Sequence, residues 1–278
     1  MMRVFAVALD LLYEAARRRW FLALGGAITL FLIGLALSLQ LDVVEGTLAA
    51  TRLFGDDISG PMQAVDVVLR PLYRACAYVI FFGGIVFGTL ACADFAPSLL
   101  SPGRIEHLLS LPVRRVELIA GTFLGVLTIA IIGGLYGALG FTVVLGVKSG
   151  IWTMGPLYSA VLAGIGFSAI YGAMLAAATF VRSAALSAAV GAGVLLAGII
   201  SSFRADLASL FNPGIWRGIF EAFTALMPRF VTLAQASADI AASAPLSMGA
   251  LLRLLLGMLL FGVSMTFVAA WRIERMDF

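Results

Sequence analysis

Six long apolar stretches that contain no charged residue and no histidine constrain this chain more than any other feature. Each is long enough, or nearly so, for an α-helix of about 20 residues that crosses a bilayer and pairs its backbone polar groups internally. Hydrophobic residues make up 62% of the 278 positions and charged residues 12%, which leaves too little polar surface for a soluble globule. We therefore predict an all-α polytopic membrane protein with a single transmembrane domain over residues 1–278. Its spans would cover residues 20–41, 75–93, 118–147, 157–181, 183–203 and 254–271.

Basic residues indicate which side of the membrane the chain ends occupy. An even number of spans places both termini on one side, and arginine and lysine concentrate in cytoplasmic segments. Arg17, Arg18 and Arg19 directly precede the first span, and the segments 1–19 and 94–117 are rich in arginine. We predict a multi-pass protein of the cell inner (cytoplasmic) membrane with both termini in the cytoplasm. The outer loop 42–74 carries several carboxylates.

Residues 1–19 predict an amphipathic helix that lies in the membrane interface. At about 100° per residue, four charged residues fall within one narrow stripe, and the remaining surface is largely apolar. Such a helix buries its apolar surface at the headgroup boundary and keeps its polar stripe in water. We expect the stripe to face the cytosol, and it consists of Arg3, Asp10, Glu14 and Arg17.

The outer loop 204–253 contains two short apolar segments, residues 207–210 and 216–226. Both are too short to cross a bilayer. Pro213 and Pro228 interrupt them, because proline breaks a helix. We expect short re-entrant or interfacial helices in this loop.

The sequence lacks the patterns of several enzyme classes. A P-loop requires glycine directly before lysine, whereas the single lysine, Lys148, follows Val147. The single histidine, His107, cannot form a zinc site alone. Cys76 and Cys92 are too far apart along one apolar stretch to form a disulfide. We expect no catalytic residue, metal or cofactor in this chain, and any ATP-driven work needs a separate ATPase that binds ATP and Mg.

The inner loop between the second and third spans predicts a short helix over residues 102–111. Ser101 can cap its first turn, Pro102 suits the first helical position, and Pro112 ends it. Apolar residues cluster on one side and polar residues on the other. Such an amphipathic helix could dock in a groove on a soluble partner and transmit the partner's motion to both spans.

The run from Gly103 to Gly125 resembles the inner-loop signature of ABC-2 type transporter permeases. The family pattern reads G-T-x-E-x-L-L-x-x-P-x-x-R-x-E-x-x-x-G-K-x-x-G. Arg104 and Thr122 depart from it, and Asp94 corresponds only weakly to an acidic residue that the family carries upstream. The matching positions are Gly103, Glu106, Leu108, Leu109, Pro112, Arg115, Glu117, Gly121 and Gly125.

This resemblance implies a coupling helix that docks on a cytosolic ABC ATPase, and a second permease copy or a related chain as partner. Arg114 and Arg115 could equally serve only as topology anchors. The residues expected to couple to the ATPase are Gly103, Arg104, Glu106, His107, Leu108, Leu109, Pro112, Arg114, Arg115 and Glu117.

The expected function is the membrane subunit of an ATP-driven exporter, and the charge-free spans favour an apolar or amphiphilic substrate. The alternative is an ATP-powered membrane machine or scaffold that passes conformational change to an outer-side partner without solute transport. An ion-coupled carrier is disfavoured because no span contains a titratable charge. The small net charge of +3 gives no sign of a nucleic-acid partner.

Overall fold

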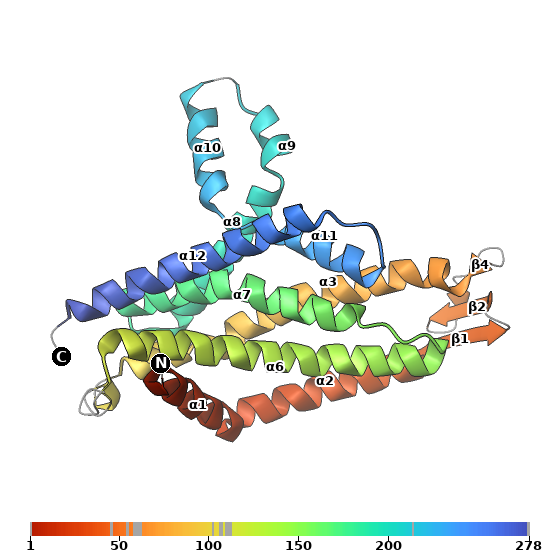
Figure 1. The fold of residues 1–278 in the computed structure, drawn as a ribbon, viewed down its shortest axis with the longest axis horizontal. Helices are drawn as coiled ribbons and strands as arrows, with labels where there is room; N and C mark the ends of the chain where they lie inside the picture. The colour runs from red at the N-terminus through yellow and green to blue at the C-terminus, as the bar shows by residue number, and fades with distance from the viewer. Residues whose placement is uncertain are drawn as a thin grey trace.

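The computed structural model describes residues 2–44, 47–53, 56–57, 63–101, 103–105, 108, 113–212 and 214–276. The protein is an elongated helical bundle, and both chain termini lie toward the same end of it (Figure 1). We call this the terminal end. Within the described residues, six helices are long and apolar enough to cross a membrane, which confirms a multi-pass, all-α membrane bundle. They are α2 (Arg19–Ser38), α3 (Val65–Cys92), α6 (Arg115–Ser149), α7 (Gly155–Phe180), α8 (Ala184–Ser202) and α12 (Met248–Glu274).

Helix α7 is the centre of the bundle. It contacts α3, α6, α8, α11 and α12. Within its most apolar stretch of 18 residues, 83% of the residues are buried. Phe167 and Tyr171 are among its fully buried side chains, and their rings stack 5.9 Å apart. The other five long helices are less buried, and each exposes large apolar side chains of the kind that a lipid-facing helix carries.

Helices α7 and α12 approach each other closely at two glycines. A Cβ atom added to Gly262 would lie 2.5 Å from the carbonyl oxygen of Ser168. A Cβ atom added to Gly172 would meet the carbonyl oxygen of Gly262. Small residues allow this backbone contact, which is a common basis of helix association in membranes.

The described part of the chain also contains five shorter helices. Helices α9 and α10 form a hairpin that projects from the side of the bundle (Figure 1). Helix α10 coincides with the predicted apolar segment 216–226, whereas α9 begins before the segment 207–210 and overlaps it only in part. Their depth in a membrane stays a prediction. Helix α11, which was not predicted, packs against α3, α7 and α8. The bounds are α1 (Met2–Arg17), α4 (Phe95–Leu99), α9 (Arg204–Ser209), α10 (Ile215–Leu226) and α11 (Phe230–Ala241).

A small antiparallel sheet follows α2 at the end of the bundle away from the termini (Figure 1). Strand β1 (Leu39–Val44) pairs with β2 (Thr47–Leu53), which also pairs with β3 (Asp56–Asp57) and β4 (Gln63–Ala64). The first span was predicted to continue to residue 41, and this boundary is wrong because α2 ends at Ser38. Leu39, Leu41 and Val43 alternate with Gln40 and Asp42, which is the period of a strand.

Candidate functional site

Glu14 is the centre of an ion-pair network at the terminal end of the bundle. Its carboxylate accepts two hydrogen bonds from the Arg104 guanidinium, one of them at 3.2 Å, and a third from Arg18 Nη2 at 2.6 Å. The second terminal nitrogen of Arg18 donates to Asp94 Oδ2 at 3.0 Å. The Arg18 guanidinium also lies 4.6 Å from the centroid of the Phe95 ring. The network therefore joins α1, the α1–α2 junction, the start of α4 and the segment 103–105.

The surroundings of Glu14 favour its charged form. Burial alone would raise the pKa of this carboxyl, but the hydrogen bonds and charges of Arg104 and Arg18 outweigh the burial and hold its pKa below the ordinary value. A carboxylate with a lowered pKa stabilises the folded state fully above its unfolded pKa of about 4.3. That stabilisation is lost as the pH falls through the pKa that Glu14 has in the folded state.

We expect Glu14→Gln to lower the free energy of unfolding at pH 7 by about 1 kcal/mol, since the three side chains are partly exposed and water screens the pairs. The difference from the wild type should shrink below about pH 4. Thermal unfolding in detergent, measured between pH 7 and pH 3, checks both statements. Glu221→Gln is the matched control, because Glu221 pairs with Arg217 on its own helix, at the surface of α10. If the free energies of unfolding of Glu14→Gln and the wild type differed by the same amount down to pH 3, the ionised state assigned to Glu14 would be contradicted.

Gly103 sets the direction of the chain just before Arg104. Its φ is +82°, in the left-handed region that glycine adopts without a steric cost. Of the predicted coupling helix 102–111, Arg104, Ile105 and Leu108 have helical backbone. Ile105 is buried, and Leu108 is partly buried against the core. The remaining predicted coupling residues, Glu106, His107, Leu109 and Pro112, lie outside the described residues.

Arg115 holds the first turn of α6 against the last turn of α12. Its Nη1 atom donates to the carbonyl oxygens of Ile273 at 3.1 Å and Met276 at 2.6 Å. The last carbonyls of a helix lack partners within the helix and carry partial negative charge, so a guanidinium stabilises them. The structure therefore gives this predicted docking residue a contact within its own chain.

Glu117 caps the first turn of α6. Its Oε2 atom accepts a hydrogen bond from the backbone N–H of Arg114 at 2.9 Å and lies 4.0 Å from Arg3 Nη1. A carboxylate at this position satisfies a backbone donor that has no partner within the helix. The Arg114 side chain is exposed at the surface of the terminal end.

Helix α1 packs closely against α6 at Gly121 and Gly125. A Cβ atom at Gly121 would lie 2.6 Å from Val7 Cβ, and one at Gly125 would lie 3.1 Å from Ala8 Cα. The sequence shows a G-x-x-x-G pattern that permits a close helix contact. The structure identifies α1 as the helix in that contact.

The opposite side of α1 is apolar and exposed. Phe5, Leu9 and Tyr13 recur at every fourth residue, with exposed fractions of 62%, 54% and 68%. Arg3, Asp10 and Arg17 of the predicted polar stripe are also exposed, whereas Glu14 is half-buried in its ion pairs. A helix with one apolar side on the bundle and another free suits the membrane interface, which stays a prediction.

Sequence reasoning did not assign Arg18 to this site and gave Asp94 little weight. Their partners are distant in sequence, because 76 residues separate Arg18 from Asp94 and 90 separate Glu14 from Arg104. The one available signal was a carboxylate at the edge of an apolar span, which needs a counter-charge nearby. Within the described residues no group of histidine, cysteine and carboxylate side chains could hold a metal ion. A scan against protein-family models and a search of curated proteins find no match to the chain.

Proposed function

We propose that this chain is the membrane subunit of an ABC-2 type exporter, driven by a separate cytosolic ABC ATPase that binds ATP and Mg. The terminal end would face the cytoplasm, and a second permease copy would pair with the chain across the bilayer. The observation that carries the proposal is the Arg104–Glu14 ion pair, which links the inner loop to α1. A force applied to the loop would therefore reach the spans.

A continuous set of contacts supports transmission from the loop into the bundle. Arg104 pairs with Glu14 on α1, and α1 sits on the two glycines of α6. Arg115 joins α6 to the end of α12, and α12 contacts α7 backbone to backbone. Closely packed elements move as units and do not deform gradually, so displacement of the loop would shift several helices together.

Site-specific crosslinking tests both the orientation and the partner. The native thiols, Cys76 and Cys92, are buried, so a cysteine introduced at the surface is the main target for a thiol reagent. In membranes of the native host, Arg114→Cys should crosslink to a protein that a photoreactive ATP analogue labels. Trp152→Cys is the matched control, because Trp152 is 64% exposed and lies just beyond the other end of α6.

The expected result is a nucleotide-labelled product at Arg114→Cys and none at Trp152→Cys. A membrane-impermeant maleimide that reaches Arg114→Cys from outside intact cells would reject the orientation. A product at Arg114→Cys that never binds nucleotide would reject the partner.

The sheet at the end away from the termini favours the alternative of a membrane machine that acts on an outer-side partner, because it gives that end an ordered element. Vesicles reconstituted with the permease and its ATPase separate the two functions. ATP-dependent movement of a fluorescent amphiphile across the bilayer supports an exporter, whereas ATP hydrolysis without movement supports a machine.

A further inference from the structure

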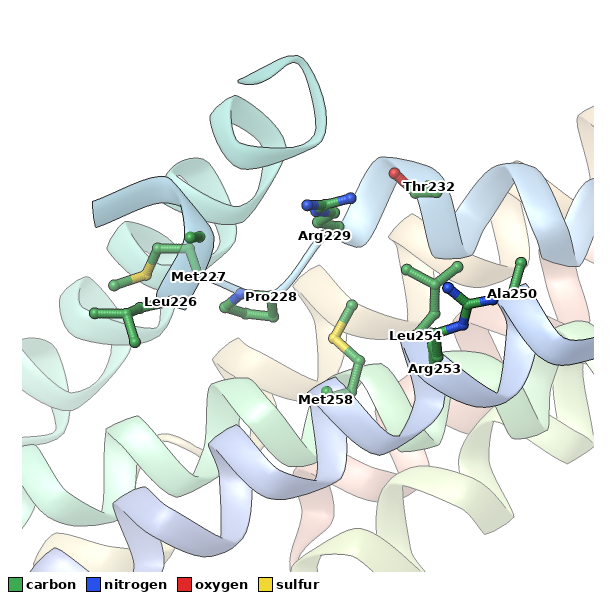
Figure 2. Close-up of a pocket in the computed structure, with 11 residues that line it drawn as sticks. Leu226, Met227, Pro228, Arg229, Thr232, Ala250, Arg253, Leu254 and Met258 are labelled. Carbon is green, nitrogen blue, oxygen red and sulfur yellow. The ribbon is translucent and has the colours of Figure 1, made fainter. Parts of the chain in front are cut away.

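A cavity of about 470 Å³ lies between the α10–α11 turn and the first turns of α12. Figure 2 shows the turn and α12 as its two walls, with Arg229 on the first wall and Arg253 on the second. This volume falls within the range of small-molecule sites, about 300–1,000 Å³.

Among the residues that the structure describes, the cavity is lined by positive charge without a compensating acid. Arg229 and Arg253 line it, and its lining includes neither aspartate nor glutamate. Among the described residues neither arginine pairs with a carboxylate, and Arg253 only donates from Nε to the carbonyl oxygen of Gly249 at 3.3 Å. The carboxylates on the neighbouring helices are already paired, Asp239 with Arg74 and Glu221 with Arg217.

Apolar side chains make up most of the remaining lining. Of the lining residues, Pro228 and Met258 are buried, and Leu226 is exposed. Gly257 opens the α12 wall, since a Cβ atom added there would meet nothing within 4 Å. Beyond the cavity, Phe261 and Val268 lie on the same side of α12 as Gly257, and Phe261 is partly buried whereas Val268 is exposed.

We propose that this cavity binds an anionic amphiphile, whose phosphate or carboxylate head lies between Arg229 and Arg253 and whose chain follows α12. Planar guanidinium groups bind such heads through paired, charge-assisted hydrogen bonds. Arg253 directly precedes the predicted sixth span, so the head would lie at the membrane boundary and the chain in the hydrocarbon. That this ligand is the exported substrate rests on the proposed function. The binding itself does not require an ATPase.

Binding to the purified full chain in detergent, without any ATPase, tests the site separately from the exporter function. Two fluorescent probes distinguish the sources of the head group: phosphatidic acid represents a bilayer lipid, and dodecyl phosphate represents a single-chain cargo. The double variant Arg229→Gln/Arg253→Gln should bind at least one probe tenfold more weakly than the wild type. The matched control Arg217→Gln, whose side chain lies outside the cavity on α10, should bind as the wild type does.

Gly257→Leu provides a second variant that keeps both arginines and fills the cavity with a side chain. It should weaken binding of the same probe, and its thermal unfolding should match that of the wild type. A tenfold loss in the double arginine variant, together with weaker binding of the same probe by Gly257→Leu, supports the site, and the probe affected identifies the source of the head group. Binding of both probes by the double arginine variant that stays within a few fold of the wild type would overturn the proposal, and would leave the ATPase crosslinking result unaffected.

Discussion

Gly262→Ala is expected to destabilise the protein by about 2–3 kcal/mol, and Gly262→Leu is expected to leave no folded protein, because overpacking at this position meets backbone and not a movable side chain. The added Cβ atom would lie 2.5 Å from the Ser168 carbonyl oxygen and 3.2 Å from the Ala169 nitrogen. Helices α7 and α12 would have to separate, and the contact between them is the most extensive between any two elements described.

The matched control is Gly257→Ala on the same helix. It makes the same chemical change where nothing lies within 4 Å, so it should be neutral or slightly stabilising through helix propensity. The unfolding temperature of each variant in detergent is measured by size-exclusion chromatography of heated samples. Equal unfolding temperatures for the two alanine variants would show that the helices do not touch at Gly262.

The second large effect is expected at Gly121. Gly121→Leu should push α1 off α6, because its Cβ atom would lie 2.6 Å from Val7 Cβ and 2.9 Å from the Val4 carbonyl oxygen. The extensive contacts of α7 are with α3, α6, α8, α11 and α12, so the long helices should stay assembled when α1 is displaced. Under the proposed function, the variant would assemble with its ATPase but hydrolyse ATP without moving substrate.

Cysteine labelling measures the position of α1 directly. Ala8 is 7% exposed on the side of α1 that packs against α6, so Ala8→Cys should react slowly with a maleimide in the otherwise native chain and at least tenfold faster with Gly121→Leu. Gly133→Leu is the control on the same helix, since nothing lies within 4 Å of its Cβ position. Equally slow labelling in both backgrounds would show that α1 is held by other contacts.

Hydropathy alone predicted where the six spans lie, because a bilayer demands a minimum length and an apolar composition of every helix that crosses it. It did not predict α11, whose sequence contains Gln235, Ser237 and Asp239 and has no span-length apolar run. The sheet was missed for a similar reason, since the apolar residues that alternate from Leu39 onward directly continue the first span.

Residue types at the candidate site were readable from the sequence, but their partners were not. A G-x-x-x-G pattern permits a close neighbour without specifying which, and the structure places α1 there. Arg115 stood out in the signature-like run, yet its acceptors are backbone carbonyls at the other end of the chain, which no side-chain pattern reveals. Pairings of this kind depend on the tertiary fold.

The unequal lengths of the spans have a consequence for the surrounding lipid. Helix α6 has 35 residues, about 52 Å along its axis, whereas α8 has 19 residues, about 28 Å. Exposed apolar residues occur along α6 from Leu124 to Val147. A bilayer that matches α8, with a hydrocarbon core of about 30 Å, is too thin for an upright α6. Hydrophobic mismatch must therefore differ around the circumference of the protein, and either α6 tilts or the acyl chains beside it stretch.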